Sequence, residues 1–480
     1  MLNRLRRFQS NHPLWPVHAG ILATFALIPV WFRFKLSPGP FDALYSTGFL
    51  IFWSMLWTVA WWLILKLPGF KGLRQNRLRC LWALLLMILA CWAFLSWSWA
   101  YTRTFRPQVT IGGALPFSLS MLFTLVVACT APRPRHLITV LIAGVVVSSG
   151  IAGWQVARQG PTNLSFLGEF NINPANSGVS VVQAGDVRWL RPYGLLPHPN
   201  ILAGFLAIGL LCAGVGVLSD RRKIRWMSMV VFLFGLWALL LTFSRSAWIG
   251  FAAGGFALLP FLWGRLKMRD MRLTLTIFVM SVIITGALFT VIYRPFLAAR
   301  TGEGDESIEL RSISDRVVYN EMAYRAIASS PVVGVGINNF PWIASYYLTL
   351  TDYDLRGQPV HQIFLSAWSE LGAVGFTITV ITLLLGVEIA LKSQRQTAPD
   401  SEWYADKLAQ AAMLCGVIAL MVIGLLDHYP WTLIHFQVAW WGLLAAAGNP
   451  ITKNAAPLSE NGAAMVVNSQ AVESNPMPAA

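Results

Sequence analysis

The sequence predicts an all-α polytopic membrane protein with about twelve transmembrane helices. Of its 480 residues, 56% are hydrophobic and only 12% are charged. Apolar runs long enough to cross the hydrocarbon core as helices recur along the chain. These runs lack the polar–apolar alternation that the strands of a membrane barrel would show. The composition therefore excludes an ordinary soluble domain.

The first part of the chain, 1–293, is expected to hold nine spans, with an outer loop at about 154–198. The spans are predicted at about 17–32, 46–66, 80–101, 114–131, 137–153, 199–219, 226–243, 246–263 and 272–293. Only the short break at Ser244–Arg245–Ser246 separates the seventh span from the eighth. The N-terminal segment lacks the small-residue cleavage site of a signal peptide, so the first span is expected to be retained.

A second long outer loop, 294–360, separates these spans from three more. Within it, the segment DRVVYNEMAYRAIA has apolar residues at three-to-four spacing, which predicts a short helix that Ser314 or Asp315 can cap. The last three spans are predicted at 361–391, 407–427 and 431–447, within a membrane part at 361–449. The tail, 450–480, is rich in Ala, Asn, Ser and Pro and is expected to be disordered.

Positive charge predicts the orientation. Most of the 36 Lys and Arg residues fall in the short loops and ends on one side of the spans, which marks that side as cytoplasmic. Both termini are therefore expected to be cytoplasmic, in the cytoplasmic (inner) membrane, with both long loops outside. The net charge of +15 is then a signal of topology in a lipid bilayer, and nucleic acid is not an expected partner.

Four separated segments carry polar residues near the expected outer ends of the spans. They are RPYGLLPHPNILAGFLAIGLL, LTFSRSAWIGF, DRVVYNEMAYRAIASSPVVGVGINNF and HQIFLSAWSELGAVGF. Their order and pattern resemble the O-antigen ligase and O-antigen polymerase superfamily of membrane glycosyltransferases. The shared features are an Arg-x-x-Gly before Pro-Asn, a Ser-Arg pair, an Arg leading a helix into Pro-x-x-Gly-x-Gly, and a His leading into Glu-x-Gly-x-x-Gly. The resemblance covers roughly 190–380 and departs at Gln362, where the family more often has Asn.

This resemblance implies a GT-C-like helical fold and a glycan transferase. The donor would be a glycan on polyprenyl diphosphate (undecaprenyl diphosphate), and the acceptor a hydroxyl of a glycan, glycolipid or cell-wall polymer. His361 would be the catalytic base, and Arg191, Arg245 and Arg316 would hold the diphosphate. Arg presents a planar, permanently charged fork that matches phosphate oxygens, and His takes up a proton near neutral pH. The implied mechanism needs no metal and no cofactor.

Other polar residues are weaker candidates for the same site: Arg188, Arg311, Arg325, Glu370, Asp427 and His428. For Arg245 the alternative role is contact with lipid headgroups, and for Arg191 and Arg316 it is a loop-fixing salt bridge. Glu370 follows His361 by about two and a half helical turns, so it is expected deep in the membrane, paired or protonated. A structural role fits it better than a catalytic one. His198, between two prolines, is expected to cap a helix or to lie at the interface.

A twelve-helix transporter is the alternative from another class, because many secondary transporters share this span count and orientation. Transport would favour charged residues near the middle of the membrane. Among the charged residues, only Glu370 and Glu388 lie inside a predicted span rather than at its end. A transferase is therefore favoured. An O-antigen ligase, a polysaccharide polymerase and a protein-glycosylating enzyme remain alternatives, because they differ in an acceptor that these motifs do not identify.

Overall fold

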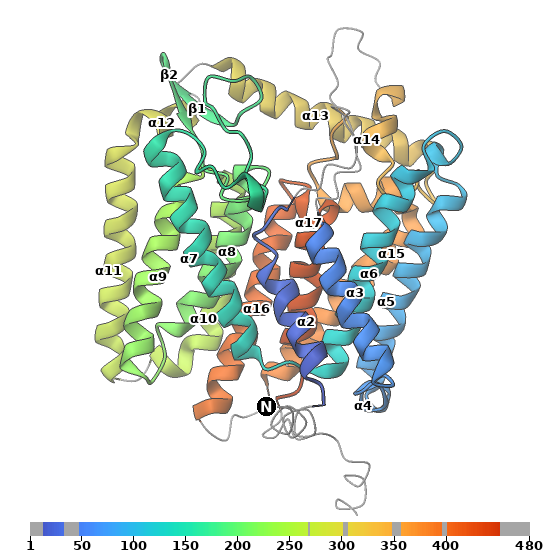
Figure 1. The fold of residues 1–480 in the computed structure, drawn as a ribbon, viewed down its shortest axis with the longest axis horizontal. Coiled ribbons are helices and arrows are strands. Elements are labelled where there is room, and N and C mark those ends of the chain that lie inside the picture. Colours follow the sequence, from blue (N-terminus) through green and yellow to red (C-terminus); the bar gives the residue numbers. More distant parts are fainter. Residues whose placement is uncertain are drawn as a thin grey trace, which may run out of the picture.

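The computed structural model describes residues 13–32, 48–266, 269–300, 306–347, 357–395 and 401–451. In these ranges the chain is a bundle of helices with one two-stranded hairpin. Figure 1 shows the hairpin, β1 (Val181–Ala184) and β2 (Val187–Leu190), on the same face of the bundle as α13 (Glu306–Ser329). The short α4 (Phe70–Gln75) lies at the opposite face. The two long loops thus share one face, here called the hairpin face.

A helix forms at each of the first nine predicted spans. These are α2 (Trp15–Ala26), α3 (Phe49–Ile64), α5 (Arg77–Leu95), α6 (Pro107–Thr130), α7 (Pro134–Arg158), α8 (Pro199–Gly216), α9 (Arg222–Leu241), α10 (Arg245–Leu266) and α11 (Arg269–Ile292). Four of them, α2, α6, α7 and α8, have proline in the first turn, where the missing N–H costs no intrahelical bond.

The remainder of the chain is less regular than the hydropathy predicts. Its elements are α12 (Arg294–Ala298), α13, α14 (Phe340–Ile343), the 3₁₀ turn η5 (Ala344–Tyr347), α15 (Ile363–Gln394), α16 (Ser401–Gly424), α17 (Tyr429–Thr432), α18 (Ile434–Gln437), η6 (Val438–Gly442) and α19 (Leu443–Ala447). The helix predicted within 294–360 is present as α13 and is longer than predicted. The last predicted span divides into α18, the π-helical η6 and α19.

Nine helices of the described chain are long and apolar enough to cross a membrane. The apolar helices at 49–64 and 434–447 are shorter. In each of the two central helices, α8 and α16, 83% of an apolar 18-residue stretch is buried inside the protein. In α11 only 6% of such a stretch is buried, so its side chains face outward. These helices mark a multi-pass membrane protein whose least polar surface faces lipid.

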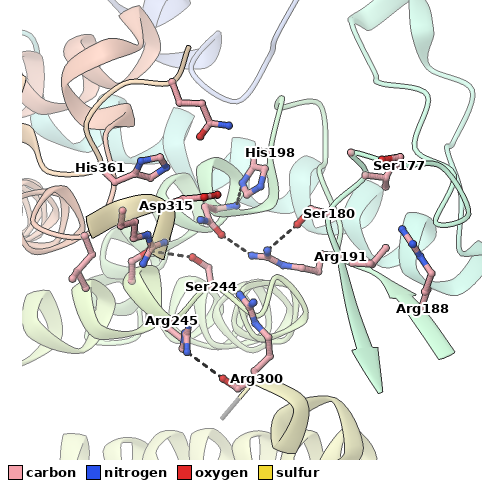
Figure 2. Close-up of a pocket in the computed structure, with 18 of the residues that line it drawn as sticks. Ser177, Ser180, Arg188, Arg191, His198, Ser244, Arg245, Arg300, Asp315 and His361 are labelled. Carbon is pink, nitrogen blue, oxygen red and sulfur yellow. Dashed lines mark hydrogen bonds between the residues drawn. The ribbon is translucent and has the colours of Figure 1, made fainter. Parts of the chain in front are cut away.

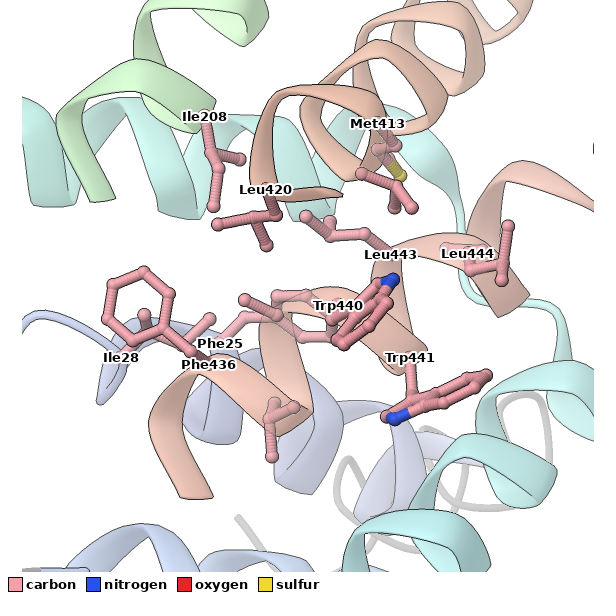
Figure 3. Close-up of a cluster of buried hydrophobic side chains, with 14 of the residues drawn as sticks. Phe25, Ile28, Ile208, Met413, Leu420, Phe436, Trp440, Trp441, Leu443 and Leu444 are labelled. Carbon is pink, nitrogen blue, oxygen red and sulfur yellow. The ribbon is translucent and has the colours of Figure 1, made fainter. Parts of the chain in front are cut away.

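The core lies where α8 and α16 meet the last helices. Phe25, Ile208, Leu420, Phe436 and Trp440 converge there, each essentially without exposed surface (Figure 3). Because lipid is as apolar as these side chains, close packing rather than water exclusion stabilises their contact.

Two glycines bring α10 against α16. A Cβ added at Gly250 would lie 2.7 Å from the carbonyl oxygen of Ala419, and one at Gly254 would lie 2.8 Å from that of Cys415. The four-residue spacing places both glycines on one side of α10, so the two backbones touch. This contact fixes the start of α10, which carries Arg245, beside the end of α16, which leads to Asp427.

A break divides α15 at Gly372, where φ is 67° and ψ is −177°. The segment 331–336 fills the break: Ala373 N donates to Pro331 O at 2.8 Å, and Val335 N donates to Ser369 O at 2.9 Å. A Cβ at Gly372 would lie 2.2 Å from Val332 O, so only glycine fits. The span predicted as continuous is thus two helices, and the two glycine motifs of the sequence pair with each other. This pairing fixes the position of the short helix between His361 and the break at Gly372.

Candidate functional site

A cavity of ≈ 740 Å³ opens at the hairpin face between the loop 175–181, the starts of α8 and α10, the middle of α13 and the segment before α15. His361, Arg191, Arg245 and Arg316 all line it, and Figure 2 shows how the labelled side chains among them approach one space. These four residues belong to the four motif segments, which lie far apart in the sequence. The structure therefore brings all four principal site candidates together.

The lining is strongly basic. Among the described residues, five arginines contribute to it against one carboxylate, Asp315; the arginines are Arg188, Arg191, Arg245, Arg300 and Arg316. Such a concentration of cations in a partly enclosed cavity attracts anions and suits the oxygens of phosphate groups. Arg300 was not predicted as a site residue. In the sequence, only its position near the start of the large outer loop could have suggested it.

Arg191 is fixed by three hydrogen bonds and is 4% exposed. Its guanidinium donates to Thr242 O at 2.6 Å, to Ser180 Oγ at 2.8 Å and to Asn200 Oδ1 at 2.6 Å. These partners come from the α9–α10 turn, the hairpin loop and α8. Arg191 is therefore a rigid cation that holds three elements together at the cavity wall.

A clasp of two side-chain hydrogen bonds, one from Arg245 and one from Arg300, joins the α9–α10 turn to residue 300. Arg245 Nη1 donates to Arg300 O, and Arg300 Nη2 donates to Phe243 O, both at 3.1 Å. Phe243 has a φ of 50°, in the left-handed region that side chains other than glycine rarely adopt. The tight turn and the clasp together direct both arginines to the cavity (Figure 2).

The remaining arginines occupy different surroundings. Arg316 projects from α13, next to Asp315. Arg188 is exposed on β2, where it donates to Asn176 O at 3.4 Å. The side chain of Arg311 lies outside the described residues. Arg325 is directed elsewhere, since it pairs with Glu321 at 2.9 Å on α13 itself.

His361 directly precedes Gln362, whose side-chain oxygen accepts the N–H of Leu365 and so caps α15. Gln362, which stands where the family more often has Asn, thus caps the start of this helix. The ring of His361 lies edge-on to that of His428, with centroids 5.0 Å apart, and its Nδ1 is buried without a hydrogen-bond partner among the described residues. His361 lines the cavity and is partly exposed, and a neutral imidazole accepts a proton through one ring nitrogen.

Asp427 completes the group around His361. Its carboxylate is 4% exposed, and its Oδ2 accepts from Asn200 Nδ2 at 3.0 Å while its Oδ1 accepts from the backbone N of His428 at 2.9 Å. Asn200 also receives the bond from Arg191. Sequence analysis gave no role to Asn200, although it is the Asn of the Pro-Asn motif.

Burial and charge set the protonation of this group. Burial lowers the pKa of His361; Asp427 opposes this shift and Arg316 adds to it. Burial likewise lowers the pKa of His428 to about 4 and that of His198 to about 3. Burial alone would raise the pKa of Asp427, but the three histidines and the Asn200 amide bring it below its usual range. Near neutral pH the site thus holds neutral imidazoles beside a charged carboxylate.

His198 has two roles in the structure. Its Nδ1 accepts the backbone N–H of Asn200 at 3.2 Å, so it caps α8 as expected, and it also lines the cavity. The ligand atoms of His361, Asp427 and His428 lie within 4.8 Å of one another, a spacing that a metal ion also uses. The five arginines around them disfavour a cation, and both oxygens of Asp427 already accept hydrogen bonds.

Glu370 has a structural position. It is 4% exposed, and its Oε2 accepts from Trp431 Nε1 at 3.0 Å, while its backbone oxygen accepts from Gly336 N at 2.9 Å. It is buried as expected, but its partners belong to segments of the hairpin face. Because Trp431 lies on α17, three residues after His428, the bond from Glu370 helps to hold the His428 segment opposite His361.

Comparison with known families matches residues 229–380 to the model described as O-antigen ligase. No curated protein matches the chain. The matched residues include Arg245, Arg316 and His361, whereas Arg191 and Asp427 lie outside them. The match supports a membrane enzyme of the O-antigen ligase and polymerase type. It confirms the resemblance drawn from the motifs over residues 229–380, a segment that is similar to the O-antigen ligase superfamily.

Proposed function

We propose that the protein is a ligase that transfers a glycan from polyprenyl diphosphate to an acceptor hydroxyl at the outer face of the cytoplasmic membrane. The observation that carries this proposal is one cavity that, among the described residues, is lined by five arginines and by His361. The hairpin face would be the outer face, with both termini in the cytoplasm.

In the proposed reaction the acceptor oxygen attacks the anomeric carbon of the donor sugar. The bond from that carbon to the diphosphate oxygen breaks, and the lipid diphosphate leaves with the electron pair. His361 takes the acceptor proton, so the products are the new glycoside, the lipid diphosphate and a protonated imidazole that returns its proton to solvent. Each step uses groups present at the cavity.

The arginines act on the leaving group. Negative charge grows on the diphosphate as its bond to the sugar breaks, and cations already held in place stabilise it without reorganising. Arg191 meets this condition, since its three hydrogen bonds hold it in position. Arg245, Arg300 and Arg316 approach the same space from α10 and from 294–360.

His361 acts on the acceptor. A base must be unprotonated at the working pH, and burial lowers the pKa of His361 below its ordinary value. The charged Asp427 nearby would stabilise the imidazolium that forms. The apolar Ile249 and Leu426 at the cavity edge would allow the lipid part of the donor to remain in the membrane.

His361→Ala tests the function. We expect purified His361→Ala in lipid nanodiscs to bind a polyprenyl-diphosphate glycan while transferring it at least about a hundredfold more slowly. His136→Ala is the matched control and should transfer at the wild-type rate. It removes an exposed histidine in the first turn of α7, at the end of that helix away from the hairpin face. Full transfer by His361→Ala would refute the base assignment. Loss of both binding and fold would instead show that the histidine is structural.

A further inference from the structure

Asn200 lies between two charged side chains of the site, the Arg191 guanidinium and the Asp427 carboxylate. It is the second residue of α8, and its single side-chain amide serves both neighbours. The amide oxygen accepts from Arg191 Nη2 at 2.6 Å, and the amide nitrogen donates to Asp427 Oδ2 at 3.0 Å. A guanidinium can only donate and a carboxylate can only accept, so the two partners together fix the orientation of the amide.

Asp427 extends this chain to the base. Its carboxylate oxygen, the ligand nitrogen of His361 and that of His428 lie within 4.8 Å of one another. The carboxylate is held from two sides, by Asn200 and by the backbone of His428, so it cannot rotate without breaking a bond. Arg191 and His361 are thus linked by side chains that are all held in place.

We propose that Asn200 is a positioning residue that couples Arg191 to His361 through Asp427. The inference rests on the proposed function, because it gives the link between the group that would hold the diphosphate and the group that would take the proton. The amide holds the Arg191 guanidinium and the Asp427 carboxylate in one fixed arrangement, and it thereby sets where the carboxylate stands relative to the imidazole. The anion site and the base are then placed relative to each other before the donor binds.

Asparagine is the side chain that meets both demands. Aspartate at position 200 would still accept from Arg191 but would place a second carboxylate against Asp427, and one of the two would have to take up a proton. Leucine has a similar shape but would leave both a buried cation and a buried anion without this partner. Glutamine would be one methylene longer and would shift both neighbours.

Several charged and titratable groups surround His361 and must be held constant in any test. They are Asp427 and His428 after α16, Asp315, Arg316 and Tyr319 on α13, and His198 before α8. A test that exchanges the amide and the carboxylate between positions 200 and 427 leaves all the others in place. It also keeps one amide, one carboxylate and their hydrogen bond.

The test compares Asn200→Asp, Asp427→Asn and the double exchange Asn200→Asp/Asp427→Asn. Asn200→Asp removes the donor to Asp427, and Asp427→Asn leaves one amide oxygen where two carboxylate oxygens accepted, from Asn200 and from His428 N. For each single change we expect kcat to fall at least about tenfold, with a smaller change in KM for the lipid-linked donor. In the double exchange the amide at position 427 donates to the carboxylate at position 200, so thermal stability should return to the wild-type value. Its kcat should stay low and the acid limb of its pH profile should move to lower pH, because the charge has left the vicinity of His361.

A purely structural role would give a different result, since restored stability would then restore kcat and the pH profile. Recovery of both in the double exchange would overturn the inference, as would wild-type kcat in Asn200→Asp. If the single variants do not fold, the double exchange decides alone, because it retains the hydrogen bond. Asn163→Asp, an exposed position in the loop after α7, is the control and should change neither quantity.

Titration of His361 itself separates this inference from the proposed function. The pH dependence of its modification by diethyl pyrocarbonate, followed by peptide mass spectrometry on the purified protein, needs no transfer activity. A shift of that profile in the double exchange supports the coupling even if His361→Ala transfers normally, which would refute only the base assignment. An unshifted profile together with an inactive His361→Ala would refute the coupling and leave the proposed function standing.

Discussion

Opposite charges on either side of His361 predict opposite shifts in the pH dependence of transfer. Asp427 raises the pKa of the imidazole and Arg316 lowers it. If His361 is the base, the rate falls as the pH drops through that pKa, because only neutral imidazole accepts the proton. Asp427→Asn should therefore move the acid limb to lower pH, and Arg316→Gln should move it to higher pH.

The size of the first shift follows from the distance. At 4.8 Å, the upper limit between the ligand atoms of His361 and Asp427, Coulomb's law gives about 0.9 kcal/mol in bulk water and about 3.5 kcal/mol at the effective dielectric of a protein site. These energies correspond to roughly 0.6 and 2.5 pH units. Because the cavity is open to water, we expect a shift near the lower end, about one unit.

The assay is the initial rate of transfer from a polyprenyl-diphosphate glycan, measured from about pH 4.5 to 8.5 at saturating donor. Arg158→Lys serves as the control and should retain the wild-type profile, because Arg158 is exposed and its guanidinium lies over the Trp154 ring, 5.4 Å from the ring centroid. Shifts of both variants in the same direction would contradict the assignment of His361 as the titrating base. Unshifted profiles in both would place that base elsewhere.

Three further predictions test the arginines, the break in α15 and the orientation. Arg191→Lys, Arg245→Lys and Arg316→Lys should each express normally yet transfer about tenfold to a hundredfold more slowly, since Lys keeps the charge and loses the fork; near-wild-type rates in all three would make these arginines structural. Gly372→Ala should lower the free energy of unfolding by at least about 2 kcal/mol in a thermal melt in detergent, whereas Gly286→Ala, with open space around its Cβ, should not; equal melting temperatures would contradict the strain argument. In a cysteine-free background, Asp186→Cys on the hairpin should react with an impermeant thiol reagent in intact cells and Arg74→Cys on α4 should not, and the reverse pattern would invert the orientation.

Hydropathy was sufficient to predict where the helices lie, because each span is a local property of its own residues. The resemblance of the motifs to a known family was sufficient to select four residues that line one cavity, His361, Arg191, Arg245 and Arg316. The break at Gly372 was not predictable in this way. Glycine is common in membrane helices, and the break exists only because a distant segment supplies the hydrogen bonds that fill it.

The same limit explains the residues that were missed. Arg300 and Asn200 are ordinary polar residues in their own segments, and each gains its role from a partner far along the chain. Asp427 was a candidate only because it ends a span on the same side as His361. Its hydrogen bond to Asn200 joins residues 227 positions apart. Such pairings belong to the packing of the bundle and are absent from any local pattern.

The contact between α10 and α16 determines which side of the cavity can move. Gly250 and Gly254 bring the two backbones close together, so we expect this side of the site, the floor, to be rigid. Opposite this floor, the loop 175–181 and α13 approach the cavity from outside the bundle. Entry of a bulky glycan and release of product must then come from displacement of this roof. We expect amide hydrogen exchange to be slow along α10 and α16 and faster across the roof, and a bound donor to slow the roof alone.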